Sequence, residues 1–131
     1  ILDVKQSNIK IGGDGIYIFE DVRKGDFIGE YTGDILKHNK NTCVGDYSIS
    51  ISNKYYINSQ HFPRCYMAMI NDAHGTKFKN NCEFKLITTD KHGKPLPENK
   101  RKVKIYATRN IKAGSELFAS YGKNYWKSRD K

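Results

Sequence analysis

The sequence has no long apolar run and few cysteines. None of its apolar stretches approaches the ~20 residues that a membrane-spanning helix requires, so we expect a soluble chain with no membrane contact. The three cysteines, Cys43, Cys65 and Cys82, are odd in number and far apart. Their spacing supports neither a paired disulfide framework nor a CxxC-type zinc site, and it favours reduced thiols in a cytosolic or nuclear protein. No metal site is predicted.

Extended helical periodicity and internal repeats are also absent. Only residues 63–70, with Tyr66, Met67 and Ile70 at helix-like spacing, favour a helical turn, and Pro63 suits its first position. A doubly wound nucleotide-binding fold is disfavoured because it needs long amphipathic helices between its strands. Since nothing divides the 131 residues, we expect one domain over residues 1–131.

Short strand-like segments dominate what is present. Residues 47–52 (YSISIS) alternate large and small side chains with the period of a half-buried strand. Similar short runs, separated by Gly, Asn, Asp and Lys, occur at residues 16–19, 27–31, 55–57, 82–88, 103–107 and 116–121. The sequence therefore predicts a mainly β protein with several small β-sheets and little helix.

The charge of the chain is strongly positive. Its 23 basic and 14 acidic side chains give a net charge of +9 at pH 7. Residues 88–104 (TTDKHGKPLPENKRKVK) hold much of the excess and have the Gly and Pro content of a projecting turn. Basic faces attract nucleic acid and its complexes, so residues 91–104 are a candidate DNA contact, and a merely solvated loop is the alternative.

Several short motifs follow one another in a fixed order. Residues 11–17 (IGGDGIY) form a glycine-rich turn that leads into a strand, which excludes the dinucleotide fingerprint and is also compatible with an ordinary hairpin. Further motifs are RKGDFIGEYTGD at residues 23–34, IND at residues 70–72, NC at residues 81–82 and IYATRNIKAGSELFASYG at residues 105–122. Their order is more informative than any single motif.

Together with Tyr47, these motifs resemble the SET-domain family of protein lysine methyltransferases, whose consensus runs GxG, KGxFIxEYxGE, a strand tyrosine, RFINHS followed by NC, and GEELxxxY. The resemblance covers nearly the whole chain. It implies the SET fold, several small β-sheets around a pseudoknot. It also implies methyl transfer from S-adenosylmethionine to a protein lysine, with a histone tail or nucleosome as the expected substrate and a nuclear, chromatin-associated role.

The chain departs from the family pattern at two places. Where the family reads Asn-His-Ser, this chain has Asn71, Asp72 and Ala73. The family histidine meets the adenine largely through backbone groups, so Asp72 can still serve, but we expect the bracing by its side chain to be lost. The chain also lacks a zinc cluster after the domain, and its ending YGKNYW at residues 121–126 resembles minimal viral SET proteins, whose aromatic tail closes the lysine channel.

The resemblance assigns roles to individual residues. Tyr121 is the catalytic tyrosine beside the sulfonium methyl group, and Tyr47 is the strand tyrosine that orients the amine. The expected cofactor-binding residues are Gly13, Asp14, Gly15, Ile16, Tyr17, Asn71, Asp72, Tyr121 and Trp126, and the expected substrate-binding residues are Tyr47, Phe84, Ala119 and Tyr125. Purely structural alternatives are core packing for Tyr47, Tyr121, Tyr125 and Trp126, and turn stabilisation for Asn71.

Two further expectations concern the outcome of the reaction. Phe84 and Ala119 occupy the positions at which family members carry an extra tyrosine hydroxyl that limits product number, so the resemblance implies di- or trimethylation, unless both are plain core residues. Two other functions remain open. One is an inactive SET-like protein- or chromatin-binding module in which Asp72 and Ala73 fail to hold the cofactor, and the other is a small basic nucleic-acid-binding β domain. The Tyr121 motif argues against both.

Overall fold

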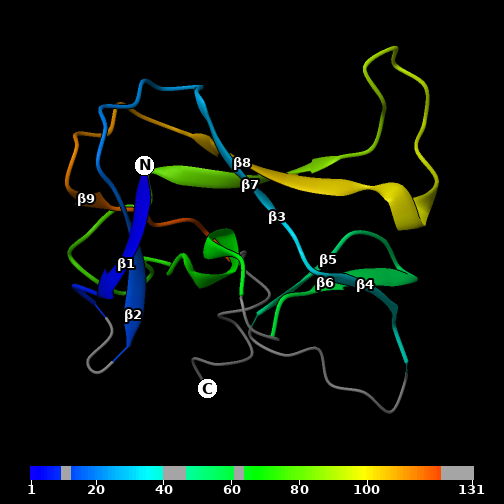
Figure 1. The fold of residues 1–131 in the computed structure, drawn as a ribbon, viewed down its shortest axis with the longest axis horizontal. Helices are drawn as coiled ribbons and strands as arrows, with labels where there is room; N and C mark the ends of the chain where they lie inside the picture. The colour runs from blue at the N-terminus through cyan, green and yellow to red at the C-terminus, as the bar shows by residue number, and fades with distance from the viewer. Residues whose placement is uncertain (10–12, 40–46, 61–63, 122–131) are drawn as a thin grey trace.

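The computed structural model describes residues 1–9, 13–39, 47–60 and 64–121, and Figure 1 gives the course of the chain. Within these ranges the secondary structure is almost entirely β, with two short 3-10 helices. The elements are β1 (Leu2–Gln6), β2 (Asp14–Ile18), β3 (Phe27–Tyr31), β4 (Asp34–Lys37), β5 (Ser48–Ser50), β6 (Tyr55–Asn58), η1 (Tyr66–Met69), β7 (Cys82–Ile87), η2 (Glu98–Lys100), β8 (Lys102–Ala107) and β9 (Ser115–Glu116).

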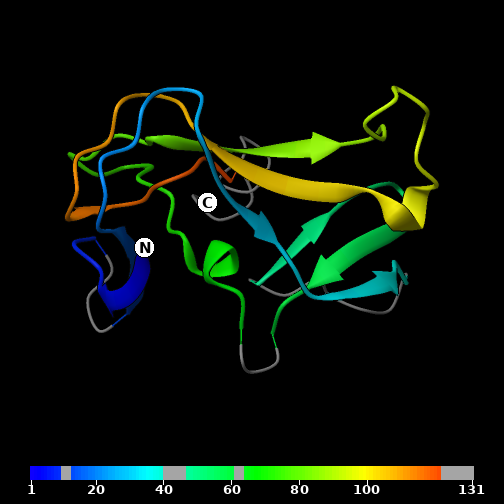
Figure 2. The same ribbon diagram turned by 45° about the horizontal axis from the view of Figure 1, so that its top comes forward.

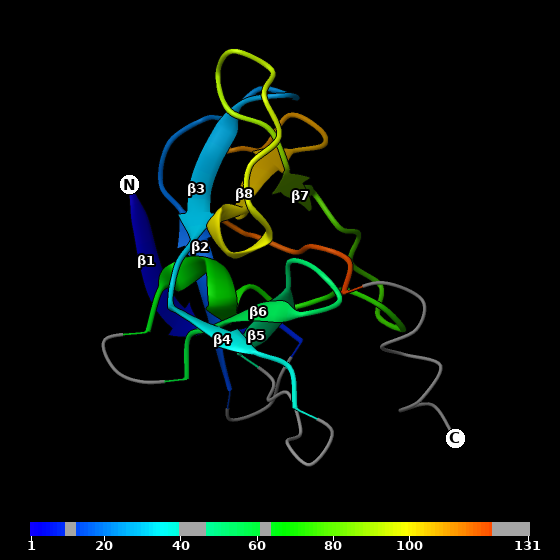
Figure 3. The same cartoon turned by 90° about the vertical axis from the view of Figure 1, so that its right-hand side faces the viewer.

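The strands form three separate antiparallel sheets of three strands each, with the orders β1-β2-β9, β3-β8-β7 and β4-β6-β5. In Figure 1 the first sheet lies at the left, the second crosses the top and the third lies at the lower right. Figure 3 shows the second and third sheets one above the other, with β1 and β2 to one side. The prediction of a mainly β fold with several small sheets is confirmed.

The core is built from strands with one buried face. In β8, Val103, Ile105 and Ala107 are buried and alternate with more exposed residues, as the two-residue period of a strand requires. β2 lies between β1 and β9, which buries it from Gly15 to Ile18. Ile70, Asp72 and Ala73, which follow η1, are also buried.

The helical turn η1 fits closely against β3. A Cβ atom on Gly29 would lie 2.9 Å from the sulfur of Met67, so the absence of a side chain lets Met67 pack against the strand. In Figure 2, η1 lies between the β1-β2-β9 and β4-β6-β5 sheets. The turn predicted over residues 63–70 is therefore present at Tyr66–Met69, and it delivers the chain directly to Ile70 and Asn71.

Cys65 and Cys82 are free thiols. Among the residues that the structure describes, no group of three or more His, Cys, Asp or Glu side chains is placed to hold a metal ion. In the same part of the chain, no helix has both the length and the apolar character needed to cross a membrane.

Candidate active site

The segment that follows β9 lies between Asn71 and Cys82. Phe118 forms a parallel β-bridge with Asn71, and Ala119 forms another with Cys82. The Cys82 N–H donates to the Phe118 carbonyl at 3.0 Å, and the Ala119 N–H donates to the Asn71 carbonyl at 3.0 Å. Three motifs that are far apart in the sequence thus meet where this segment runs inward from β9 (Figure 2). This crossing is the pseudoknot that the sequence predicts.

Glu116 lies at the centre of a polar network, the Glu116 network, which it forms with Ser7, Asn8, Tyr17 and Asn71. It is only 4% exposed. Its Oε2 accepts hydrogen bonds from Ser7 Oγ at 2.7 Å and Asn71 Nδ2 at 3.4 Å, and its Oε1 accepts one from the Asn8 N–H at 2.8 Å. The Tyr17 hydroxyl lies 3.3 Å from Oε1, and burial, followed by Glu116, raises the pKa of Tyr17. The hydroxyl therefore stays protonated and able to donate.

The glycine-rich motif packs against the Glu116 network. A Cβ atom on Gly15 would collide with the Glu116 carboxylate, so glycine is required there by a close approach. The Asp14 carbonyl accepts a hydrogen bond from Asn71 Nδ2 at 2.9 Å, and Gly13 precedes it directly. The structure therefore brings together Gly13, Asp14, Gly15 and Asn71, four of the residues predicted for the cofactor site.

Asn81 fixes the other side of the crossing segment. Its Oδ1 accepts the Phe118 N–H at 2.9 Å, and its Nδ2 donates to the Glu116 carbonyl at 3.0 Å. Because Asn81 is buried and water cannot reach its side-chain amide, these two hydrogen bonds satisfy that amide. Burial raises the pKa of the neighbouring Cys82 thiol to about 12, so this thiol is neutral near pH 7 and is not a nucleophile.

Asp72 braces the residue that the sequence marks as catalytic. Its Oδ2 accepts the backbone N–H of Tyr121 at 2.8 Å, and its Oδ1 accepts the His74 N–H at 2.9 Å and Asn80 Nδ2 at 3.2 Å. Asp72 is buried, so these hydrogen bonds act with little competition from water. The expectation that bracing by this side chain is lost is wrong, because a carboxylate can accept several N–H groups at once.

A small cavity of about 110 Å³ opens beside Tyr121. We call it the aromatic cavity, and its lining residues are Tyr31, Ser48, Ile49, Ala68, Ile70, Phe84 and Tyr121. They come from β3, β5, η1, β7, Ile70 just after η1 and the segment after β9, so all three sheets or their extensions contribute. The rings of Tyr31 and Phe84 meet edge to face with centroids 6.2 Å apart. An aromatic wall of this kind favours an aliphatic chain with a polar end.

The hydroxyl of Tyr121 donates to the Ile70 carbonyl with an O–O distance of 2.5 Å. Its proton is therefore committed, and the lone pairs of the hydroxyl oxygen remain as acceptors. Burial raises the pKa of Tyr31 far above its usual range, and the proximity of Cys65 and Tyr121 adds to this effect. Tyr31 is consequently neutral, so the cavity contains two uncharged phenols.

The SET-domain family model matches residues 13–122. The chain belongs to the SET-domain family. Among solved structures, it is similar to the polycomb repressive complex 2 of Chaetomium thermophilum and to a humanized mutant of that complex bound to the inhibitor GSK126. Each match has 22% sequence identity and a TM-score of 0.73, and covers 95% of this chain but only 15% of the longer chain. No curated protein matched the sequence.

The family assignment and this likeness agree on the fold, so the predicted SET fold is confirmed. Members of the family are protein lysine methyltransferases. The chain spans about 15% of the length of the chains it matches in the two solved structures. Most of the length of those chains therefore lies outside the region that resembles this one.

Within this SET domain, the two predicted catalytic tyrosines lie in different surroundings. Tyr121 lines the aromatic cavity, whereas Tyr47 is not among its lining residues. The Tyr47 ring is instead covered by the Arg64 guanidinium, 3.6 Å from the ring centroid, which donates to the carbonyls of Ser59 and Gln60. The tyrosine that joins Tyr121 in the cavity is Tyr31, which lies in the EYTGD motif and has no role assigned from the sequence.

The remaining predicted residues are distributed as follows. Phe84 lines the aromatic cavity, and Ala119 is fully buried beside Cys82 without lining it. Ile16 is fully buried in β2, and its carbonyl accepts the Leu117 N–H, so the structure presents no free surface of this residue to a ligand. Tyr125 and Trp126 lie outside the described residues.

The chemistry of the site suits S-adenosylmethionine, whose sulfonium group is positively charged. The hydroxyl oxygen of Tyr121 and the carbonyl oxygen of Ile70 lie together at the cavity wall and provide electron-rich atoms for a cation. The Asn71 side-chain nitrogen Nδ2 is used inside the Glu116 network, which leaves the side-chain oxygen Oδ1 to accept a hydrogen bond from an ammonium group. The residues present therefore fit the donor that the family uses.

Proposed function

We propose that this chain is a protein lysine methyltransferase that moves a methyl group from S-adenosylmethionine to a lysine side chain. The observation that carries the proposal is the aromatic cavity, which Tyr121 and Tyr31 line together with mostly apolar side chains. The reaction requires a neutral amine in line with a methyl group that bears positive charge. A narrow apolar cavity with phenolic oxygens meets both requirements.

The aromatic cavity favours the reactive form of lysine. With an unperturbed pKa of ~10.4, only roughly 0.04% of lysine is free amine at pH 7. Burial against the rings of Tyr31 and Phe84, which contact each other edge to face, disfavours the ammonium form and lowers its pKa. A decrease of about two units corresponds to ~2.7 kcal/mol. Neither tyrosine is an anion that would oppose this effect, because the Tyr31 pKa is raised and the Tyr121 proton is held by Ile70.

Tyr121 acts by position and by partial charge. When bound, S-adenosylmethionine would supply an activated methyl group, which would pass to the lysine lone pair while the electron pair of the broken S–C bond stays on sulfur. The oxygens of Tyr121 and Ile70 would stabilise the positive charge at the reacting group, and the methylated ammonium would lose its proton to water.

The cofactor site is proposed to lie along the glycine-rich motif and the pseudoknot. Gly13, Asp14 and Gly15 offer backbone at a close approach, and Asn71 offers its side-chain oxygen Oδ1 to the amino-acid end of the cofactor. The other residues proposed for this site are Ile16, Tyr17, Asp72, Tyr121 and Trp126. The hydrogen bonds of Asp72 favour an active enzyme over an inactive module, since they support Tyr121 directly.

The number of methyl groups follows from the walls of the aromatic cavity. Phe84 lines it without a hydroxyl, and Ala119 leaves the neighbouring position small. A partly methylated amine therefore has room to turn its lone pair towards a fresh cofactor, so we expect di- and trimethyl-lysine under excess cofactor. Mass spectrometry decides this, and Phe84→Tyr or Ala119→Tyr should shift products to monomethyl-lysine. A wild-type enzyme that stops at one methyl group contradicts the expectation.

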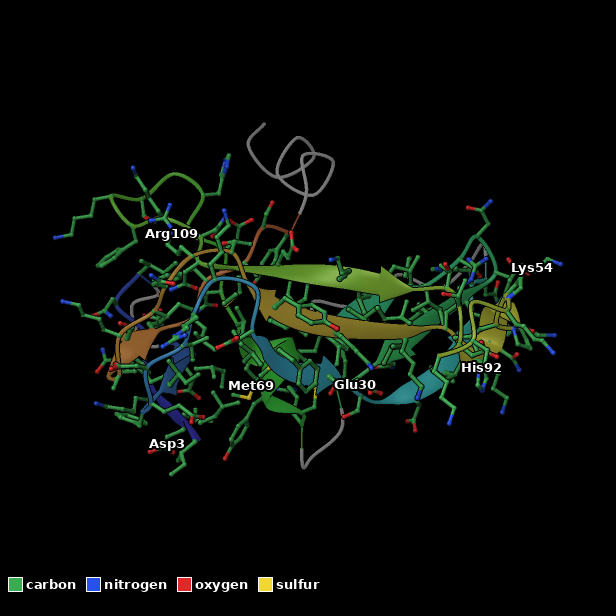
Figure 4. The ribbon with its side chains drawn as sticks, turned by 90° about the horizontal axis from the view of Figure 1, so that it is seen from above. Asp3, Glu30, Lys54, Met69, His92 and Arg109 are labelled. Carbon is green, nitrogen blue, oxygen red and sulfur yellow. The ribbon has the colours of Figure 1, made fainter. Side chains whose placement is uncertain are left out.

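Histones in nuclear chromatin are the proposed substrate. The two similar solved structures are polycomb repressive complexes, which supports this choice without identifying the lysine. The loop between β7 and β8 supplies a surface for nucleosomal DNA, because Lys91, Lys94 and Lys100 are exposed on it. In Figure 4 its residue His92 lies at one end of the molecule together with Lys54, and Arg109 lies at the other end. The proposed DNA contact is therefore confined to one end.

The experiment that tests the proposed function is transfer of a labelled methyl group to free histones, nucleosomes and a cell extract, followed by mapping of the modified residue. We expect label on a lysine of a histone. Label on another protein would support the proposed methyltransferase activity and show that the substrate is not a histone. No transfer, combined with no heat of binding for S-adenosylhomocysteine, would leave the binding module as the function.

A further inference from the structure

One buried polar atom in the wall of the aromatic cavity has no partner. Ser48 lines the cavity, and its Oγ atom is buried without a hydrogen bond. Burying a hydroxyl without a partner opposes folding, so such groups are rare in native proteins and call for a ligand or another explanation.

Other serine hydroxyls in the described residues are paired. Ser7 Oγ donates to Glu116, Ser50 Oγ lies 3.1 Å from His38 Nε2, and Ser59 Oγ accepts the Cys65 N–H at 3.1 Å. Ser50 is on the same strand as Ser48 but is exposed, where water also satisfies it. Among these serines, Ser48 is the one whose hydroxyl is buried and unpaired, and it lines the proposed substrate site.

The aromatic cavity accepts a group of limited size. An engineered cavity of ~150 Å³ holds benzene, which has six heavy atoms, so about 110 Å³ has room for roughly four or five. Four carbons and one nitrogen make up the side chain of lysine. Most of the wall is apolar, and the proton of Tyr121 is already given to Ile70. A hydrogen-bond donor at the end of an aliphatic chain would therefore fit the cavity and give the Ser48 hydroxyl a partner.

We propose that Ser48 is a specificity-determining residue whose hydroxyl accepts a hydrogen bond from the ε-nitrogen of the substrate lysine. This inference rests on the proposed function. A neutral lysine amine carries two N–H groups, a monomethyl amine carries one, and a dimethyl amine carries none. Ser48 therefore assists the first two transfers. It can only donate to the lone pair of the dimethyl amine, which withdraws that lone pair from reaction.

The consequence is that this enzyme forms trimethyl-lysine more slowly than dimethyl-lysine. The limitation comes from β5, not from Phe84 or Ala119, which carry no hydroxyl. Removing the Ser48 hydroxyl should weaken binding of the unmodified lysine and at the same time relieve the final methylation. These two opposite effects separate Ser48 from a residue that only supports the fold.

The test compares wild type, Ser48→Ala and the matched control Ser50→Ala on one peptide in unmodified, monomethyl and dimethyl forms. In Ser48→Ala we expect KM for the unmodified peptide to rise about fivefold, and the ratio of trimethyl to dimethyl product to rise about threefold. Ser50→Ala should match wild type in both. The urea midpoint of Ser48→Ala should be no lower than that of wild type, because no internal hydrogen bond is lost and a buried unpaired hydroxyl is removed.

Three results overturn this assignment. The first is an active wild type whose KM and product ratio are unchanged by Ser48→Ala, which leaves the proposed function intact. The second is an equal change in Ser48→Ala and Ser50→Ala. The third is a clearly lower urea midpoint in Ser48→Ala, which would make the hydroxyl structural. A wild type that methylates no protein overturns the proposed function and this assignment together.

Discussion

Asn71 belongs to the Glu116 network, and the preceding residue Ile70 lines the aromatic cavity. The two regions are adjacent, but they differ in whether their buried polar groups are hydrogen-bonded. In the network, both oxygens of the buried Glu116 accept hydrogen bonds from surrounding groups. In the cavity, the Ser48 hydroxyl is buried and unpaired. A region whose polar groups are satisfied holds its shape, whereas a region with an unpaired group is ready for a ligand. The Glu116 network thus holds the backbone beside the aromatic cavity in place, and the cavity keeps an unpaired hydroxyl that can bind a ligand.

The largest expected effect is on catalysis at the aromatic cavity. Tyr121→Phe keeps the ring but removes the hydroxyl that pairs with the Ile70 carbonyl. We expect methyl transfer to fall roughly a hundredfold, because one oriented dipole at the reacting group is lost. The exposed Tyr66 is the control, and Tyr66→Phe should keep wild-type turnover. Near-normal turnover in Tyr121→Phe would remove this hydroxyl from the mechanism.

The next effect is on stability and concerns the Glu116 network. Glu116→Ala removes the acceptor of the buried Ser7 hydroxyl and of the part-buried Asn8 N–H, and also the longest of the three contacts of Asn71 Nδ2. We expect the free energy of unfolding to fall by about 2 kcal/mol, as measured by urea denaturation. Glu83→Ala is the control, since its pair with Lys85 is exposed and contributes little. Equal losses in the two variants would show that the network does not hold the fold.

A smaller effect is expected where the two regions are connected through Asp72. Asp72→Ala removes the acceptor of the Tyr121 N–H, so the tyrosine is held less firmly. We expect kcat to fall about tenfold with little change in KM for the peptide, because the interaction positions a catalytic group. Asp72→Asn keeps one acceptor oxygen and should recover part of the loss. A change confined to KM, or no recovery, would contradict this role.

The smallest effect is expected far from both regions. Lys91, Lys94 and Lys100 changed together to Gln should lower activity on nucleosomes about threefold and spare free peptide, because exposed cations contact phosphates. Arg101 is unsuitable for this test, since its guanidinium donates to the Ile51 carbonyl. The charge-matched control changes Lys24, Arg109 and Lys112, and should leave nucleosome activity unchanged. Equal losses on peptide and nucleosome would favour a solvated loop.

The strands were predictable where one face is buried. Each of the runs predicted from the sequence contains residues of a strand. The last run, residues 116–121, contributes only Glu116 to β9 and continues with bridges at Phe118 and Ala119. Two strands were not predicted. β4 is exposed at all four positions, and β1 has only Leu2 and Val4 half-buried, so neither carries a strong alternating pattern. Their pairing with β6 and β2 is a tertiary effect.

The candidate site was predictable in its motifs and less so in its contacts. The order of motifs led to Tyr121 and Asn71, and the crossing at Phe118 and Ala119 brings these motifs together. The role of Tyr31 could have been suggested by its place in EYTGD. The bracing by Asp72 depends on N–H groups from distant parts of the chain, which no local pattern encodes. The unpaired Ser48 hydroxyl is likewise visible only after folding.

The most direct test of the central claim is a crystal structure of the chain with S-adenosylhomocysteine and a peptide that contains the mapped lysine. The decisive measurement is the position of the lysine ε-nitrogen. We predict that it lies in the aromatic cavity between Tyr31, Phe84 and Tyr121, within hydrogen-bond distance of Ser48 Oγ. A lysine side chain bound elsewhere, with the aromatic cavity empty or filled by other side chains, would contradict the account.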